Sequence, residues 1–76
     1  MSVVEELGDA LARDVIEAME KLGDDRLFDK LAKVVGDGSP TLLEAFTTAY
    51  RVRIAEKRSR KWLEAALKAG RAAEPL

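Results

Sequence analysis

Residues 36–42 read GDGSPTL, and this stretch divides the chain into two parts of nearly equal length. Ser39 followed by Pro40 signals the start of a helix, because Ser accepts hydrogen bonds from unpaired backbone N–H groups and Pro suits the first helical position. No Gly or Pro follows until Gly70. The sequence therefore predicts a helix over residues 40–69.

The predicted length of this helix limits how the rest of the chain can pack against it. Thirty helical residues span about 45 Å, whereas the two helices expected upstream span about 30 Å and 16 Å. The two shorter helices cannot both lie along its full length. Either the helix breaks near residues 56–61, or its C-terminal part projects beyond the other helices.

A first helix is expected over residues 3–22. Ser2 and Glu5 have the spacing of a capping box, in which each side chain satisfies a backbone N–H of the first turn. Gly8 either allows another helix to approach closely or places the true helix start after it, and Gly23 supplies a C-terminal stop. Apolar residues recur every three or four positions and form one stripe: Val4, Leu7, Leu11, Val15, Ala18, Met19 and Leu22.

A second, short helix is expected over residues 25–35, with Asp24 or Asp25 as its N-cap. Its apolar residues fall on one helical face: Leu27, Phe28, Leu31, Val34 and Val35. Residues 36–40 are expected to break the chain after this helix, since they contain two Gly residues and a Pro.

The fold class that follows is all-α, because no segment has the two-residue alternation of a β-strand. We expect one helical domain over residues 1–76, namely a small three-helix bundle with a long C-terminal helix. A four-helix bundle is the alternative if the long helix breaks. Residues 71–76 are expected to form a frayed tail, since Pro75 cannot continue a helix.

The composition argues against independent catalysis. The 76 residues include no Cys and no His, so a disulfide framework, a zinc finger, a thiolate nucleophile and the usual general base are all excluded. Residues 37–39 read DGS, which lacks the oxygen-ligand spacing of a calcium loop. We therefore expect no enzymatic activity, no cofactor and no metal site.

The net charge of −1 conceals an uneven distribution of charge. Residues 1–40 contain ten acidic and five basic side chains, whereas residues 41–76 contain four acidic and eight basic ones. The two halves can attract each other within one chain or between chains, and the basic half can face an anionic partner. No signal peptide and no apolar run of ~20 residues is visible, so we expect a cytoplasmic protein without membrane association.

The long C-terminal helix is expected to carry two apolar faces. One has the alternating spacing of three and four residues that is typical of a helix–helix seam: Leu42, Ala45, Ala49, Val52, Glu56, Ser59, Leu63 and Ala66. The other face comprises Leu43, Phe46, Tyr50 and Ile54. Glu56 and Ser59 interrupt the seam, which argues against a long uninterrupted coiled coil. Two apolar faces predict contacts with more than one helix, and most simply a twofold homodimer.

Trp62 follows a run of basic residues and has three interpretations. It anchors an interface, as Trp often does, covers the edge of the core, or stacks on a nucleobase, for which a single Trp is a weak signal. The candidate partner-binding residues are Phe46, Tyr50, Ile54, Trp62 and Leu63.

The basic run is the most distinctive feature of the sequence. It comprises Arg51, Arg53, Lys57, Arg58, Arg60 and Lys61. These side chains either contact the phosphates of a nucleic acid or form a solvated helix surface that pairs with the acidic N-terminal half. The near-zero net charge of the whole chain favours the second interpretation. A helix-turn-helix protein is a poor match, because the connection before the third helix is too long and that helix begins with apolar residues.

The leading hypothesis from the sequence is a small helical protein–protein interaction or regulatory module that self-associates and has no catalytic activity of its own. A protein of unknown identity, or a second copy of the chain, would be its partner. The alternative is a nucleic-acid-associated protein that contacts phosphates through the basic surface of residues 51–61.

Overall fold

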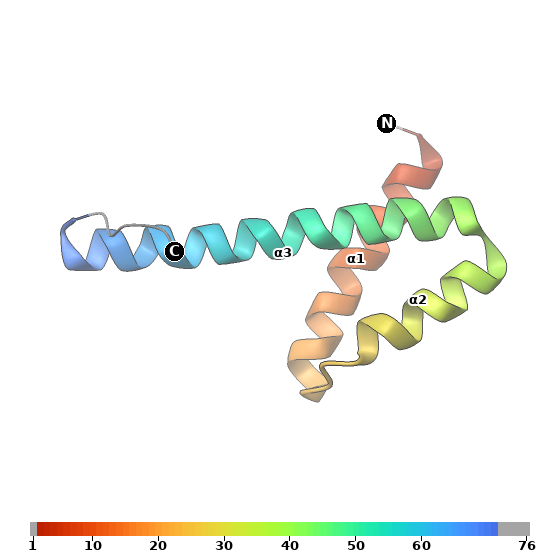
Figure 1. Ribbon diagram of the computed structural model, residues 1–76, viewed down its shortest axis with the longest axis horizontal. Coiled ribbons are helices and arrows are strands. Elements are labelled where there is room, and N and C mark those ends of the chain that lie inside the picture. Colours follow the sequence, from red (N-terminus) through yellow and green to blue (C-terminus); the bar gives the residue numbers. More distant parts are fainter. Residues whose placement is uncertain (1, 72–76) are drawn as a thin grey trace.

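The computed structural model describes residues 2–71, which form three α-helices and no strand (Figure 1). Helix α1 comprises Val3–Leu22, α2 comprises Leu27–Gly38 and α3 comprises Pro40–Ala69. The all-α prediction is confirmed for this part of the chain. The frayed tail predicted for residues 71–76 lies outside the described residues, except for Arg71.

Helix α1 begins and ends at the predicted signals. The Ser2 hydroxyl accepts a hydrogen bond from the Glu5 backbone N–H at 3.2 Å, and Gly23 ends the helix with a left-handed φ of 62°. Gly8 lies inside α1 at its crossing with α3, where a Cβ would stand 2.8 Å from the carbonyl carbon of Ala45. Of the two interpretations of Gly8, the structure therefore supports close helix–helix approach.

Helix α2 begins two residues later and ends three residues later than the predicted range 25–35. At its start, the Asp24 carboxylate accepts hydrogen bonds from the Arg26 backbone N–H at 2.9 Å and from the Lys30 ammonium at 3.0 Å. Asp24 therefore stabilises a turn before the helix and does not cap the helix directly. The Asp25 cap is not observed either, because Arg26 occupies the N-cap position without a side-chain hydrogen bond.

The chain break between α2 and α3 is much shorter than the sequence predicts. Gly36 and Gly38 remain helical, and only Ser39 is extended, with φ −158° and ψ 107°. This conformation follows from Pro40, because the residue before a proline is disfavoured in the helical region. The Ser39 hydroxyl accepts from the Leu42 N–H at 3.0 Å and so begins α3 immediately.

Helix α3 is a single helix of 30 residues, without a break at residues 56–61. Its length of about 45 Å accounts for most of the 48 Å longest dimension of the described structure. Figure 1 shows α1 and α2 beside the first half of α3, and its second half extends beyond them. Of the two alternatives left open by the sequence, a break near residues 56–61 or a projecting C-terminal part, the structure shows the second.

The core lies where the three helices meet. Ala12, Val15 and Ile16 of α1 pack with Phe46 of α3, which is fully buried. Phe28 of α2 stacks against this group, with ring centroids 5.2 Å from Phe46 and 3.9 Å from Tyr50. Leu27, Leu31 and Ala32 of α2 also pack against the core, so aliphatic and aromatic contacts together hold this short helix in place.

The core ends at Ile54 because the character of the α3 face changes there. Positions three or four residues apart share a helix face, so the face of Tyr50 and Ile54 continues with Lys57 and Lys61. Burying these ammonium groups would be unfavourable without close partners. We call residues 55–69 the arm, and we call α1, α2 and residues 40–54 the head.

Candidate interaction surface

The arm is almost entirely exposed. Every residue from 55 to 69 except Ala66 is exposed, and large apolar side chains lie among them. Trp62 retains 40% of its accessible surface, Leu63 50% and Leu67 73%. Trp62 therefore does not cover the core.

The heptad seam of α3 is covered in its first half and open in its second half. Leu42, Ala45 and Ala49 are partly buried in the head, and the Gly8 contact lies beside Ala45. From Val52, which is 63% exposed, the seam runs into solvent. We call the open part the exposed seam: Val52, Glu56, Ser59, Leu63 and Ala66.

The five candidate partner-binding residues do not form one surface. Phe46 lies inside the core, so its side chain is out of reach of a partner. Tyr50 and Ile54 are partly buried at the edge of the head, whereas Trp62 and Leu63 lie on the arm. The surface available to a partner is therefore centred on the arm and the adjoining edge of the head.

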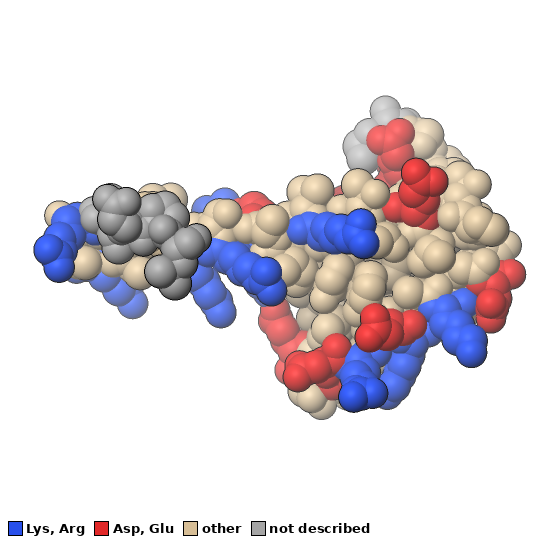
Figure 2. All heavy atoms as spheres, in the orientation of Figure 1, with Lys and Arg blue, Asp and Glu red and all other residues tan. Residues whose placement is uncertain are grey.

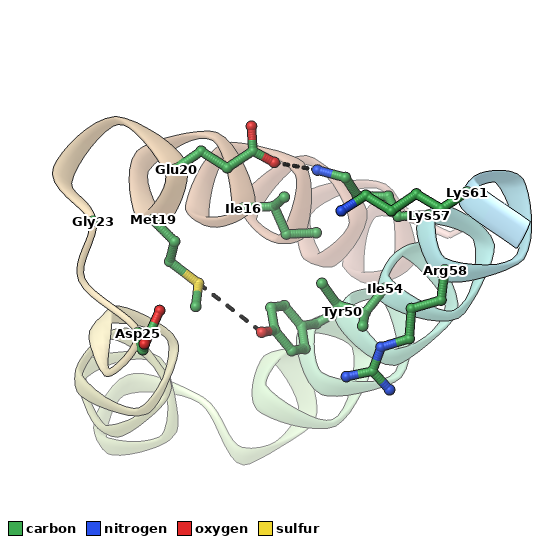
Figure 3. Close-up of a pocket in the computed structure, with 10 residues that line it drawn as sticks. All are labelled: Ile16, Met19, Glu20, Gly23, Asp25, Tyr50, Ile54, Lys57, Arg58 and Lys61. Carbon is green, nitrogen blue, oxygen red and sulfur yellow. Dashed lines mark hydrogen bonds and ion pairs between the residues drawn. The ribbon is translucent and has the colours of Figure 1, made fainter. Parts of the chain in front are cut away.

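A groove of about 470 Å³ lies in the angle between the arm and the end of α1 (Figure 3). The Tyr50 hydroxyl points toward the sulfur of Met19 at 4.0 Å, and charged side chains from both helices surround this apolar pair. The lining residues are Ile16, Met19, Glu20, Gly23, Asp25, Tyr50, Ile54, Lys57, Arg58 and Lys61.

Two ion pairs fasten α1 to α3 beside the core. The Arg53 guanidinium donates to both carboxylate oxygens of Asp9, at 2.7 and 2.8 Å. These hydrogen bonds lower the pKa of Asp9 and raise that of Arg53. Lys57 donates to the Glu20 carboxylate, which lowers the pKa of Glu20 (Figure 3). The acidic and basic halves therefore attract each other within one chain.

The remaining basic residues of the run differ in their surroundings. Arg60 donates to Glu56, four residues earlier on α3, with a shortest distance of 2.7 Å. Arg51, Arg58 and Lys61 form no ion pair with any carboxylate of residues 2–71. Figure 2 shows basic side chains along the arm and both acidic and basic side chains over the head.

Asp9, Ile16 and Glu20 of this region were not singled out as site residues by the sequence, and Met19 was predicted only as part of the apolar stripe of the first helix. Ile16 and Met19 form the apolar wall of the groove, and the two carboxylates are the partners of Arg53 and Lys57. Asp9 and Arg53 are 44 positions apart, so no local spacing links them. The charge difference between the two halves was the only indication of these ion pairs in the sequence, and it does not identify which carboxylate pairs with which basic side chain.

The comparisons with known proteins assign no family to this chain. No protein-family model, no curated protein and no solved structure matches it. Among the helices of residues 2–71, none combines the length and the hydropathy that crossing a membrane requires. Within the same residues, no three acidic side chains are grouped in a way that could hold a metal ion.

Proposed function

We propose that this chain is a small helical protein–protein interaction or regulatory module that self-associates and has no catalytic activity of its own. The observation that carries the proposal is the arm, which extends for about 22 Å and presents exposed apolar side chains. In this proposal the head is a three-helix bundle that serves as the platform, and the arm is the binding element.

The energetics of the arm support this role. Most helical stability in proteins comes from packing an apolar face against another element, and among residues 2–71 the large apolar side chains of the arm remain exposed. Trp is enriched among the residues that dominate binding energy, and Trp62 lies on the arm next to Leu63. Covering these side chains with a partner helix would remove apolar surface from water and would thereby also stabilise the helical conformation of the arm.

Light scattering coupled to size-exclusion chromatography tests the self-association. We expect the wild-type chain to elute with the mass of a dimer at high micromolar concentration and Leu63→Glu to elute as a monomer. Val34→Glu is the matched control, since Val34 is also apolar and exposed but lies on α2. A wild-type chain that remains monomeric at high micromolar concentration would contradict the proposal.

A different protein partner is tested by capture from lysate with and without nuclease. Capture that depends on Leu63 and survives nuclease supports protein binding through the arm. Loss of every specific partner after nuclease treatment would favour nucleic acid instead.

A second candidate function is contact with nucleic acid, and the unpaired state of Arg58 and Lys61 among the described residues favours it. Against it, Arg53, Lys57 and Arg60 already pair with carboxylates of this chain, which would compete with phosphates. This function predicts salt-sensitive DNA or RNA binding that weakens when Arg58, Arg60 and Lys61 are replaced together by Ala. No binding of either nucleic acid at low salt would exclude it.

A further inference from the structure

The exposed seam continues a helix–helix contact that already exists in the head. On the first half of α3, the seam positions Ala45 and Ala49 lie close to α1, which crosses α3 at Gly8. Val52 and Glu56 then line a groove of about 480 Å³ together with residues of α1. Beyond Ala49 the seam is therefore no longer covered by α1. A second helix placed along the exposed seam would continue the helix–helix packing that α1 makes with Ala45 and Ala49.

The order of apolar and polar residues along the exposed seam restricts which helix can cover it. In heptad notation Glu56 and Leu63 take a positions, and Val52 and Ser59 take d positions. In a parallel pair of identical helices each residue meets its own copy, so the two Glu56 carboxylates would face each other across the interface. Like charges brought together while losing water are unfavourable.

An antiparallel pair of identical helices resolves this conflict. Each a position then lies opposite a d position, so Glu56 meets Ser59 and Leu63 meets Val52. Apolar side chains face apolar ones, and the Ser59 hydroxyl, which here donates to the Ala55 carbonyl at 2.8 Å, can donate to the Glu56 carboxylate. The sequence is thus complementary to itself in this orientation and this register.

The charge distribution agrees with the same register independently. Antiparallel pairing carries the distal end of the arm, with Lys68 and Arg71, toward the start of α3 in the second copy. There, Glu5, Asp9 and Glu44 line a groove of about 640 Å³. The basic end of one chain therefore approaches an acidic part of the other. Attraction between these opposite charges would steer the two chains into this orientation.

We infer that two copies of this chain pair through the exposed seam with antiparallel α3 helices, Leu63 of each copy packing against Val52 of the other and Glu56 facing Ser59. The inference rests on the proposed self-association and adds the occupant, the orientation and the register of the interface. The small side chains of Ser59 and Ala66 allow the two helices to approach closely.

Cysteine cross-linking tests the register directly, because the natural chain contains no Cys. Val52→Cys and Leu63→Cys are prepared separately, mixed in equal amounts and oxidised gently. A disulfide requires Cα atoms about 4.4–6.8 Å apart, so it reports close juxtaposition. We expect the mixture to form several-fold more cross-linked dimer than either variant alone. Both positions are exposed, so neither change disturbs the core, and circular dichroism of each variant checks this.

Lys61→Cys mixed with Val52→Cys is the matched control, since Lys61 lies on the face of α3 that lines the groove beside Tyr50. It should cross-link far less than the Leu63 pair. Self-cross-linking of Val52→Cys that exceeds the mixed product would overturn the antiparallel arrangement and indicate a parallel pair. A wild-type dimer with no cross-link at either position would place the interface elsewhere and overturn this inference alone. A monomeric wild-type chain would overturn the proposed function as well.

Discussion

Replacing Gly8 with Ala is the sharpest test of how α1 packs against α3. Intrinsic helix propensity predicts stabilisation, because Gly inside a helix costs about 1 kcal/mol relative to Ala. The structure predicts the opposite sign. A Cβ at Gly8 would stand 2.8 Å from the carbonyl carbon and 2.9 Å from the Cβ of Ala45, and 2.9 Å from the backbone nitrogen of Phe46.

The magnitude follows from what must move. Two of the three nearest atoms belong to the backbone of α3, so the contact can be relieved only by shifting one helix against the other beside the buried Phe46. Overpacking of this kind costs about 1–3 kcal/mol, and the rigid neighbours place this site toward the upper end. After subtraction of the propensity gain, we expect a net loss of about 1–2 kcal/mol. In a domain of this size each kcal/mol lowers the unfolding midpoint by about 4–8 °C.

Thermal and urea unfolding followed by circular dichroism measure this loss, and two other Gly residues serve as controls. Gly38→Ala meets no atom within 4 Å and should be neutral or slightly stabilising. A Cβ at Gly36 would meet only the flexible end of Leu43, at 2.9 Å, so the stability of Gly36→Ala should lie between those of Gly8→Ala and Gly38→Ala. If Gly8→Ala proves as stable as the wild-type chain or more stable, the close α1–α3 contact is refuted.

Three further predictions concern the core, the ion pairs and the helix start. Phe46→Ala should cost about 3–5 kcal/mol and largely unfold the head, whereas Trp62→Ala should leave the urea midpoint nearly unchanged at protein concentrations low enough to keep the chain monomeric. Because Arg53 lowers the native pKa of Asp9, this pair stabilises the fold above the ordinary carboxyl pKa and is lost as the pH falls through the native value. Asp9→Asn should therefore reduce the drop in urea midpoint between neutral pH and about pH 3. Ser39→Ala removes the N-cap of α3 and should cost about 1 kcal/mol in urea unfolding.

The sequence predicted the helices well where their signals are local. The capping Ser residues before α1 and α3 each bind a backbone N–H within three positions, and Gly23 and Gly70 end their helices with left-handed backbone. Such signals depend on neighbouring residues alone, so they can be identified without knowledge of the fold. The apolar periodicity likewise identified most of the side chains that meet in the core.

The sequence predicted less where distant residues decide the outcome. Gly36 stays helical in α2, although its residue type signals a break, and it lies beside the Leu43 side chain of α3, a contact that no local pattern predicts. The partners of Arg53 and Lys57 lie on another helix and leave no local pattern. The exposure of Trp62 depends on where α1 and α2 end against α3, which neither apolar spacing nor charge reveals.

The continuity of α3 makes the folding of the arm depend on the head. A helix of about 12–15 residues is marginal in water on its own, because starting a helix costs more than extending one. The arm escapes this cost since it extends a helix that the core has already formed. Amide protection should therefore decline from Ile54 toward Ala69 in the absence of a partner. If the arm binds a partner as proposed, a substitution that loosens the core would also weaken that binding without touching the arm, because the head determines how fully the arm is folded.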